Sequence, residues 1–99
     1  MISSVIDAKA QKVWFDDDSM WLQLFDGRKL AVPLSYFPRL SNASPEQRLK
    51  FQFSGGGQGI HWEELDEDIS AEGLLAGRAS GESQSSFKRW LEEQAAQKK

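Results

Sequence analysis

The chain has 99 residues, of which 39% are hydrophobic and 27% charged, and its formal net charge is −3. These values indicate one small folded domain rather than a disordered tail. The lack of cysteine excludes a disulfide framework and a thiolate nucleophile, and a single histidine excludes a multi-histidine metal site within one chain. The acidic balance argues against a nucleic-acid binder. No segment resembles a membrane span or a signal peptide, so we expect a cytoplasmic protein.

Alternating side chains in the first third of the chain predict a three-stranded antiparallel meander. Residues 5–15 alternate between apolar and polar positions, as a strand with one solvated face does. Three aspartates at 16–18 interrupt the pattern, because a carboxylate in a turn hydrogen-bonds its own backbone. Two further apolar-rich runs, over residues 20–25 and 28–34, complete the meander.

An Asp-Gly pair at 26–27 is the strongest hairpin signal in the chain. A two-residue loop would mix polar and apolar side chains on each face of the hairpin. A three-residue loop, with a bulge at the glycine, instead pairs Leu22 with Leu30 and Met20 with Val32. Because the buried face sets the register, we predict the three-residue loop.

The middle of the chain predicts an irregular connection and then a short helix. Proline cannot donate to a strand ladder, so we expect Pro33 and Pro38 to close the third strand. Residues 35–44 are expected to follow without regular structure. Ser44 then begins a helix as its N-cap, with a proline after it and a glutamine that reaches back, and this helix ends near Leu49.

A second hairpin is predicted around closely spaced glycines. Phe51 and Phe53 alternate in a fourth strand, and residues 60–62 return as a fifth. The glycine segment lacks the Gly-Lys-Ser/Thr ending of a phosphate-binding loop, so we interpret it as a turn. Ser70 is then expected to cap one helical turn, which Gly77 stops.

The predicted fold class is α+β. A small antiparallel sheet, made of the meander and the hairpin, carries short helices in a domain over residues 1–77. Residues 78–99 comprise a linker of flexible composition and an amphipathic C-terminal helix. Aromatic residues alternate within the strands as core residues do. We therefore expect them inside the fold rather than on a stacking platform for nucleic acid.

An acidic run over residues 63–72 contains no lysine or arginine. It lacks the spacing of a calcium-binding loop. A solvated face is the ordinary interpretation, and a docking surface for a basic protein is the alternative. The candidate partner-binding residues of this run are Glu63, Glu64, Asp66, Glu67 and Asp68.

The single histidine, His61, adjoins these carboxylates, which are the groups that a proton relay or a mixed metal site would use. On a strand it shares a face with Glu63, while Trp62 points to the opposite side. No nucleophile–base pair accompanies it, so we expect no enzyme activity and no resident cofactor or metal. A small-ligand or metal sensor around His61 and Trp62 is kept as the alternative function.

An apolar stripe marks the C-terminal helix. Phe87, Trp90 and Leu91 recur at the i, i+3 and i+4 positions. A helix of about three turns is not stable alone in water, so the stripe must cover this chain's own sheet, a second copy or another protein. Of these three, we expect a contact with a homodimer partner or another protein.

Several motifs together are similar to one family. They are Val32–Leu34, Tyr36–Leu40 and, above all, Gly59–Ile69. Over about residues 5–77 the chain resembles the bacterial domain-of-unknown-function family 2442. That resemblance implies a small α+β domain with a meander, a helical segment, a hairpin and a short helix, and it carries no catalytic residues.

The resemblance also bears on partners. Some members of the family are encoded beside another small protein, an arrangement similar to toxin–antitoxin pairs. The chain lacks the helix-turn-helix of other members, so DNA binding does not carry over. We therefore predict a non-enzymatic protein-interaction module, antitoxin-like in acting as the acidic partner of a small basic protein, with no nucleic-acid or membrane contact.

Overall fold

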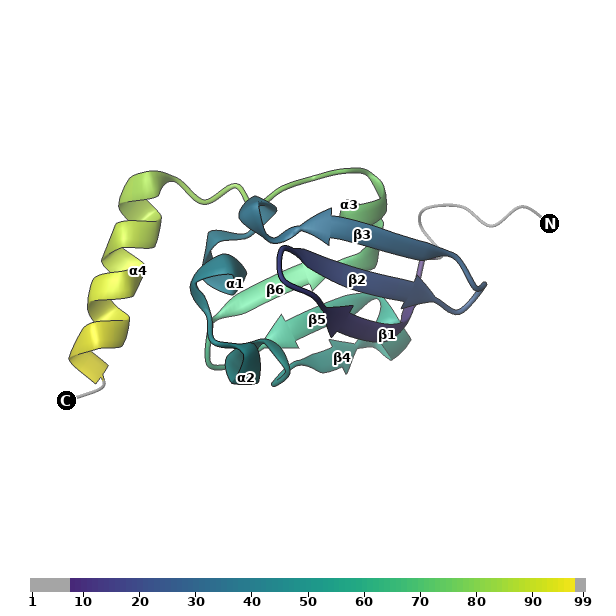
Figure 1. The fold of residues 1–99 in the computed structure, drawn as a ribbon, viewed down its shortest axis with the longest axis horizontal. Helices are drawn as coiled ribbons and strands as arrows, with labels where there is room; N and C mark the ends of the chain where they lie inside the picture. The colour runs from purple at the N-terminus through teal and green to yellow at the C-terminus, as the bar shows by residue number, and fades with distance from the viewer. Residues whose placement is uncertain (1–7, 98–99) are drawn as a thin grey trace.

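A computed structural model of the chain describes residues 8–97. Within them, two antiparallel sheets of three strands each lie one in front of the other, with short helices around them and a longer C-terminal helix at one end (Figure 1). The predicted α+β class is confirmed. The second sheet has three strands, however, where the sequence predicted only a hairpin.

The first sheet has the order β1–β2–β3. Its strands are β1 (Ala10–Phe15), β2 (Ser19–Leu24) and β3 (Lys29–Pro33). β1 is shorter than predicted, and the expected strand residues 5–7 lie outside the described residues.

The hairpin between β2 and β3 has the predicted register. Leu22 pairs with Leu30, and Met20 pairs with Val32. The glycine of the loop, Gly27, has a φ of 94°, and its N–H donates to a backbone carbonyl three residues earlier at 3.0 Å. The alternation of buried and outward residues therefore sets the loop length.

The connection after β3 is helical, which corrects the prediction of an irregular segment. It contains the 3₁₀ helix η2 (Leu34–Tyr36) and the helix α1 (Pro38–Asn42). Pro38 occupies the first helical position, where its missing N–H needs no partner. Leu34 and Leu40 bury their side chains and fix both turns against the core.

The next helix, α2 (Pro45–Arg48), confirms the predicted capping. The Gln47 N–H donates to the Ser44 hydroxyl at 3.1 Å, and the Ser44 N–H donates to the Gln47 side-chain oxygen at 2.9 Å. These two reciprocal bonds satisfy donors that have no partner inside so short a helix.

The second sheet has the order β4–β5–β6. Its strands are β4 (Gln52–Ser54), β5 (Gly59–Trp62) and β6 (Glu67–Ser70), and the 3₁₀ turn η3 (Gly55–Gly57) joins the first two. β6 was not predicted because its first two residues are acidic, and charged residues in a short segment are typical of a loop. Ile69, opposite Ile60, is what anchors it to the core.

Helix α3 (Ala71–Leu75) follows β6 directly. Its N-cap is Ser70, whose hydroxyl accepts from the Gly73 N–H at 2.9 Å, as predicted. Gly77, two residues beyond the end of the helix, has a φ of 77°. Its N–H donates to Leu74, and the Arg78 N–H donates to Gly73, both at 3.0 Å, which satisfies the last carbonyls of the helix.

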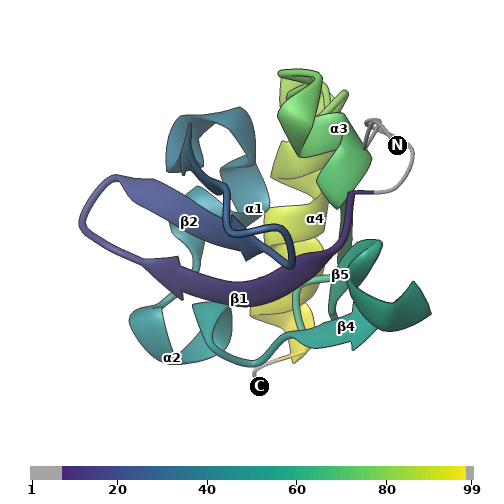
Figure 2. The ribbon, with the colours of Figure 1, turned by 90° about the vertical axis from the view of Figure 1, so that its right-hand side faces the viewer.

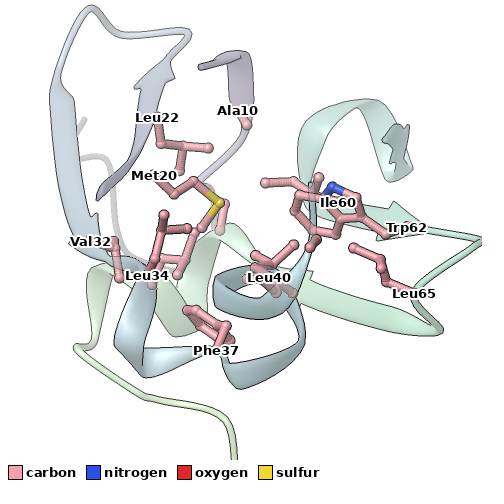
Figure 3. Close-up of a cluster of buried hydrophobic side chains, with 14 of the residues drawn as sticks. Ala10, Met20, Leu22, Val32, Leu34, Phe37, Leu40, Ile60, Trp62 and Leu65 are labelled. Carbon is pink, nitrogen blue, oxygen red and sulfur yellow. The ribbon is translucent and has the colours of Figure 1, made fainter. Parts of the chain in front are cut away.

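The core lies between the two sheets and is closed at one end by α1 (Figure 3). Met20 and Leu22 of the first sheet face Ile60 and Trp62 of the second, and Leu40 fills the space between them. The buried hydrophobic residues are Ala8, Ala10, Met20, Leu22, Leu24, Val32, Leu34, Phe37, Leu40, Ala43, Ile60, Trp62, Leu65, Ile69, Ala71, Leu74 and Trp90.

The C-terminal helix α4 (Gln84–Gln97) lies across the end of the domain (Figures 1 and 2). The segment before it is held to the domain, because the Ser80 N–H donates to the Tyr36 carbonyl at 2.9 Å and Glu82 forms an ion pair with Arg39. A freely flexible linker was expected there. No described helix is long and apolar enough to cross a membrane.

Candidate interaction surfaces

The outer face of the first sheet carries two tryptophans. Trp14 of β1 pairs with Trp21 of β2, which in turn pairs with Ala31 of β3. The two indoles are stacked, with ring centroids 6.0 Å apart and an interplanar angle of 7°. Their neighbours Met20 and Leu22 point into the core, so both tryptophans point away from it. The prediction that the strand aromatics are core residues is therefore wrong for this pair.

A hydrogen bond fixes the orientation of one of these rings. The indole N–H of Trp21 donates to Asp16 Oδ2 at 2.7 Å. The other carboxylate oxygen accepts from the Ser19 N–H at 2.9 Å, which closes the turn between β1 and β2. The bond from Trp21 is the main cause that lowers the pKa of Asp16. The carboxylate thus stays ionised and holds the ring in place.

Charged residues border the tryptophans on two opposite sides. On one side, Lys12, Gln23 and Lys29 form a row across the three strands. On the other side lie Asp16, opposite Ser19, and the rest of the β1–β2 turn. We call this arrangement the tryptophan face: a row with two lysines, a row with two tryptophans, and an acidic end.

No described helix or strand lies over the tryptophan face. In Figure 1 the sheet β1–β3 is nearest the viewer, and no element passes in front of it. In Figure 2, β2 lies on the left, β1 crosses the centre, and β4, β5 and α3 lie on the right. Ala31, in the tryptophan row, is exposed. The face is therefore open at Ala31, and Trp14 and Trp21 beside it are each partly exposed.

The acidic run is divided by the fold rather than kept as one surface. Glu63, Asp66 and Asp68 have side chains that are 87%, 84% and 77% exposed. Glu64 instead forms an ion pair with Lys50 at 2.9 Å. Glu67 lies opposite Trp62 and is only partly exposed. Of the five predicted residues, Glu63, Asp66 and Asp68 are thus the most exposed to an approaching basic partner.

His61 lies between two of these carboxylates. Its Nδ1 is 2.8 Å from Asp68 Oδ1, and its Nε2 is 3.2 Å from Glu63 Oε2. The bond to Asp68, followed by the bond to Glu63, raises the pKa of His61. A protonated ring donates from both nitrogens and has no lone pair for a metal or a substrate. Among residues 8–97, no three His, Asp or Glu side chains are grouped to hold a metal ion.

The predicted C-terminal stripe packs on the chain's own domain. Trp90 is 6% exposed and belongs to the core cluster, and Phe87 and Leu91 are partly buried against it. The Phe87 and Trp90 rings stack with centroids 5.9 Å apart. We expected this stripe to contact a homodimer partner or another protein. The chain's own domain covers Trp90, and a partner contact through the partly exposed Phe87 and Leu91 stays a prediction.

Arg39 of α1 attaches α4 to the domain. Its Nη2 is 2.6 Å from Glu82 Oε2, and the two side chains are only 16% and 8% exposed. The guanidinium carbon lies 4.9 Å from the centroid of the Trp90 ring. Nη1 also donates to the Asp66 carbonyl at 2.8 Å, which ties the β5–β6 turn to the same point. Sequence reasoning missed Arg39, since nothing local distinguishes it from a surface arginine.

Two carboxylates near Arg39 have opposite electrostatic environments. The bond from Arg39 is the main cause that lowers the pKa of Glu82. Burial is the main cause that raises the pKa of Glu67, and the neighbouring Glu82 adds to it. Glu82 therefore stabilises the fold above its unfolded pKa of about 4.5 and loses that contribution as the pH falls. The partly buried Glu67 destabilises the fold least below that pH, where its carboxyl group is protonated. It destabilises the fold more as the pH rises and the group becomes charged.

Replacing Glu82 and replacing Glu67 with glutamine should have opposite effects on the stability of the domain at pH 7. Glu82→Gln is expected to lower the free energy of unfolding by about 2–4 kcal/mol, because it leaves the Arg39 guanidinium poorly paired. Glu67→Gln is expected to raise it, because it removes a desolvated charge. Urea unfolding between pH 7 and pH 3 measures both, and both differences should shrink at the acidic end. A loss of stability in Glu67→Gln at pH 7 would contradict the assignment.

The chain belongs to the DUF2442 family of proteins of unknown function, whose model matches residues 10–80. Its fold is similar to the crystal structure of a protein of unknown function from Rhodospirillum rubrum, with a TM-score of 0.65 and 31% sequence identity, covering 79% of this chain and 94% of that one. It is also similar to the solution NMR structure of an uncharacterized protein from Chromobacterium violaceum, with a TM-score of 0.63, 28% identity, and 74% and 69% coverage. No curated protein matches the chain.

Proposed function

We propose that this domain is a non-enzymatic protein-interaction module that docks through the tryptophan face. The observation that carries the proposal is the stacked pair of Trp14 and Trp21, which points outward from the sheet. Tryptophan contributes more binding energy at protein interfaces than most residues, because it buries a large rigid surface. A sheet face with two of them, bordered by charged groups on two opposite sides, resembles an interface centre with part of its rim.

The exposed carboxylates support the more specific proposal of a basic partner. Glu63, Asp66 and Asp68 form an acidic edge on the β5–β6 turn and the start of β6. Such charges steer a basic protein towards the domain, and the steering weakens as salt is added. This edge is the remaining support for an antitoxin-like role. The alternative sensor around His61 gains no comparable support, since both ring nitrogens are bonded to carboxylates.

A photo-crosslinking side chain at Ala31 tests the proposed function. This position is exposed and lies in the tryptophan row, so a partner on the face contacts it. The same probe at Glu93, which is exposed on α4, is the control. In cells of the native host, we expect a defined product from position 31 whose yield falls in a Trp14→Ala background, and none from position 93. The absence of any product at position 31 would overturn the proposal.

A further inference from the structure

We infer that the tryptophan face docks a second copy of this chain, as a face-to-face dimer. This inference rests on the proposed function, since it uses the same surface. What it adds is one occupant for this face, a second copy of the acidic chain, which is separate from a basic protein steered by the acidic edge. It follows from the order of charges across the face rather than from its apolar character alone.

The rows of the tryptophan face are arranged from positive to negative. Lys12 and Lys29 stand in one row, and neither forms an ion pair with a described residue. Asp16 and the two aspartates that follow it stand at the other end, beyond the tryptophans. Rows on one sheet face are two residues apart, so about 7 Å separates each charged row from the tryptophan row.

This order is complementary to itself under one symmetry operation. A two-fold axis lying in the interface along the tryptophan row reverses the strand direction and turns the second sheet over. It brings the lysine row of each copy over the acidic end of the other, and each tryptophan row over its counterpart. An axis along the strands would instead place lysines over lysines. Isologous dimers require this kind of self-complementary patch.

The geometry of the sheet permits such a contact. Two sheets pack face to face about 10 Å apart, with strand directions within about 30°. Large side chains from both inner faces fill that space, and the lysine stems add apolar surface beside the rings. The bond between Trp21 and Asp16 fixes one ring before association, which lowers the ordering cost.

The size of the face sets the expected strength. Three strands about 4.8 Å apart and five residues long cover about 14 by 17 Å. Stable complexes bury about 800 Å² on each partner, which is well above this footprint. We therefore expect a weak dimer, half formed at a concentration of about 0.1–1 mM in dilute salt.

Charge reversal followed by mixing tests the dimer. One variant is Lys12→Glu with Lys29→Glu, and the other is Asp17→Lys with Asp18→Lys. Each alone places like charges against each other, so its self-association should weaken at least tenfold in sedimentation equilibrium. An equimolar mixture restores opposite charges and should associate again. Lys88→Glu with Arg89→Glu on α4 makes the same charge change away from the face and should have no effect. Circular dichroism checks that each variant is folded.

Three results would overturn the inference. They are a wild-type chain that is monomeric at about 1 mM, self-association that neither reversal weakens, and a mixture that fails to associate. The experiment at Ala31 separates this failure from that of the proposed function. If the chain is monomeric but still crosslinks there to a different protein, the proposed docking face is retained and only the self-association is rejected. If the chain is monomeric and gives no crosslink at position 31, both the docking face and the self-association are rejected.

Discussion

Replacing Trp62 with alanine is expected to lower the free energy of unfolding by about 3–5 kcal/mol. The side chain is 0% exposed at the centre of the core, and its ring centroid lies 6.0 Å from that of Phe51. Its indole N–H donates to the Arg48 carbonyl at 2.9 Å, so the change also removes a buried hydrogen bond. Urea denaturation followed by circular dichroism measures the difference.

His61 provides the matched control for this substitution, because it is the adjacent residue on the same strand. Its side chain points to the outer face of β5, where it is bonded to Asp68 and Glu63. His61→Ala should therefore destabilise the domain far less than Trp62→Ala. Equal losses in the two variants would show that the two faces of β5 are assigned wrongly.

The second large effect is expected at Gly57, where the two sheets meet. Its φ is +109°, and a Cβ added there would collide with the backbone of Ala10 in β1. Ala10 is held by the pairing of β1 with β2, and Gly57 lies in the short turn η3 that joins β4 to β5, so neither backbone can move freely. Gly57→Ala is therefore expected to cost about 3 kcal/mol or more, from backbone strain and overpacking together.

The neighbouring Gly56 separates these two causes. It also has a positive φ, of +68°, but a Cβ there would meet nothing within 4 Å. Gly56→Ala should thus cost only the left-handed backbone conformation, about 1 kcal/mol. Thermal and urea unfolding of both variants measure the difference. If Gly57→Ala is as stable as Gly56→Ala, the close contact between η3 and β1 is not a constraint on the fold.

The sequence was sufficient to predict those elements that are held together by residues close to each other along the chain. The pairing of Leu22 with Leu30 followed from alternation, and the helix at Ser44 followed from its capping residues. β6 was missed because Glu67 and Asp68 are charged, and two charged residues at the start of a four-residue segment are typical of a loop. The contacts that keep this segment in the sheet, such as that of Asp68 with His61 on the neighbouring strand, follow from the strand pairing and not from the segment's own residues.

The outward tryptophans were available from the sequence but were assigned to the wrong side. The predicted register buries Met20 and Leu22, and the residue between them on a strand must point the other way. Trp21 is that residue, and its partner Trp14 follows from the pairing of β1 with β2. Aromatic residues are usually buried, and on that ground both tryptophans were assigned to the core. The alternation of side chains along a strand is the stronger argument and places them on the outer face.

The position of α4 could not be predicted from local sequence. Its apolar stripe was evident, but a stripe does not identify the surface that covers it. The contact depends on Arg39, which lies 43 positions from Glu82 and holds both that carboxylate and the Trp90 ring. The family model matches residues 10–80, so α4 lies outside the matched residues.

The most direct test of the tryptophan face is the NMR spectrum of the four indole N–H groups as the protein concentration rises to about 1 mM. Trp14 and Trp21 lie on the proposed interface, whereas Trp62 and Trp90 are buried in the same chain and serve as internal controls. The account predicts that the Trp14 and Trp21 signals move together with concentration while the other two stay in place. Four unchanged signals, or movement confined to Trp90, would contradict it.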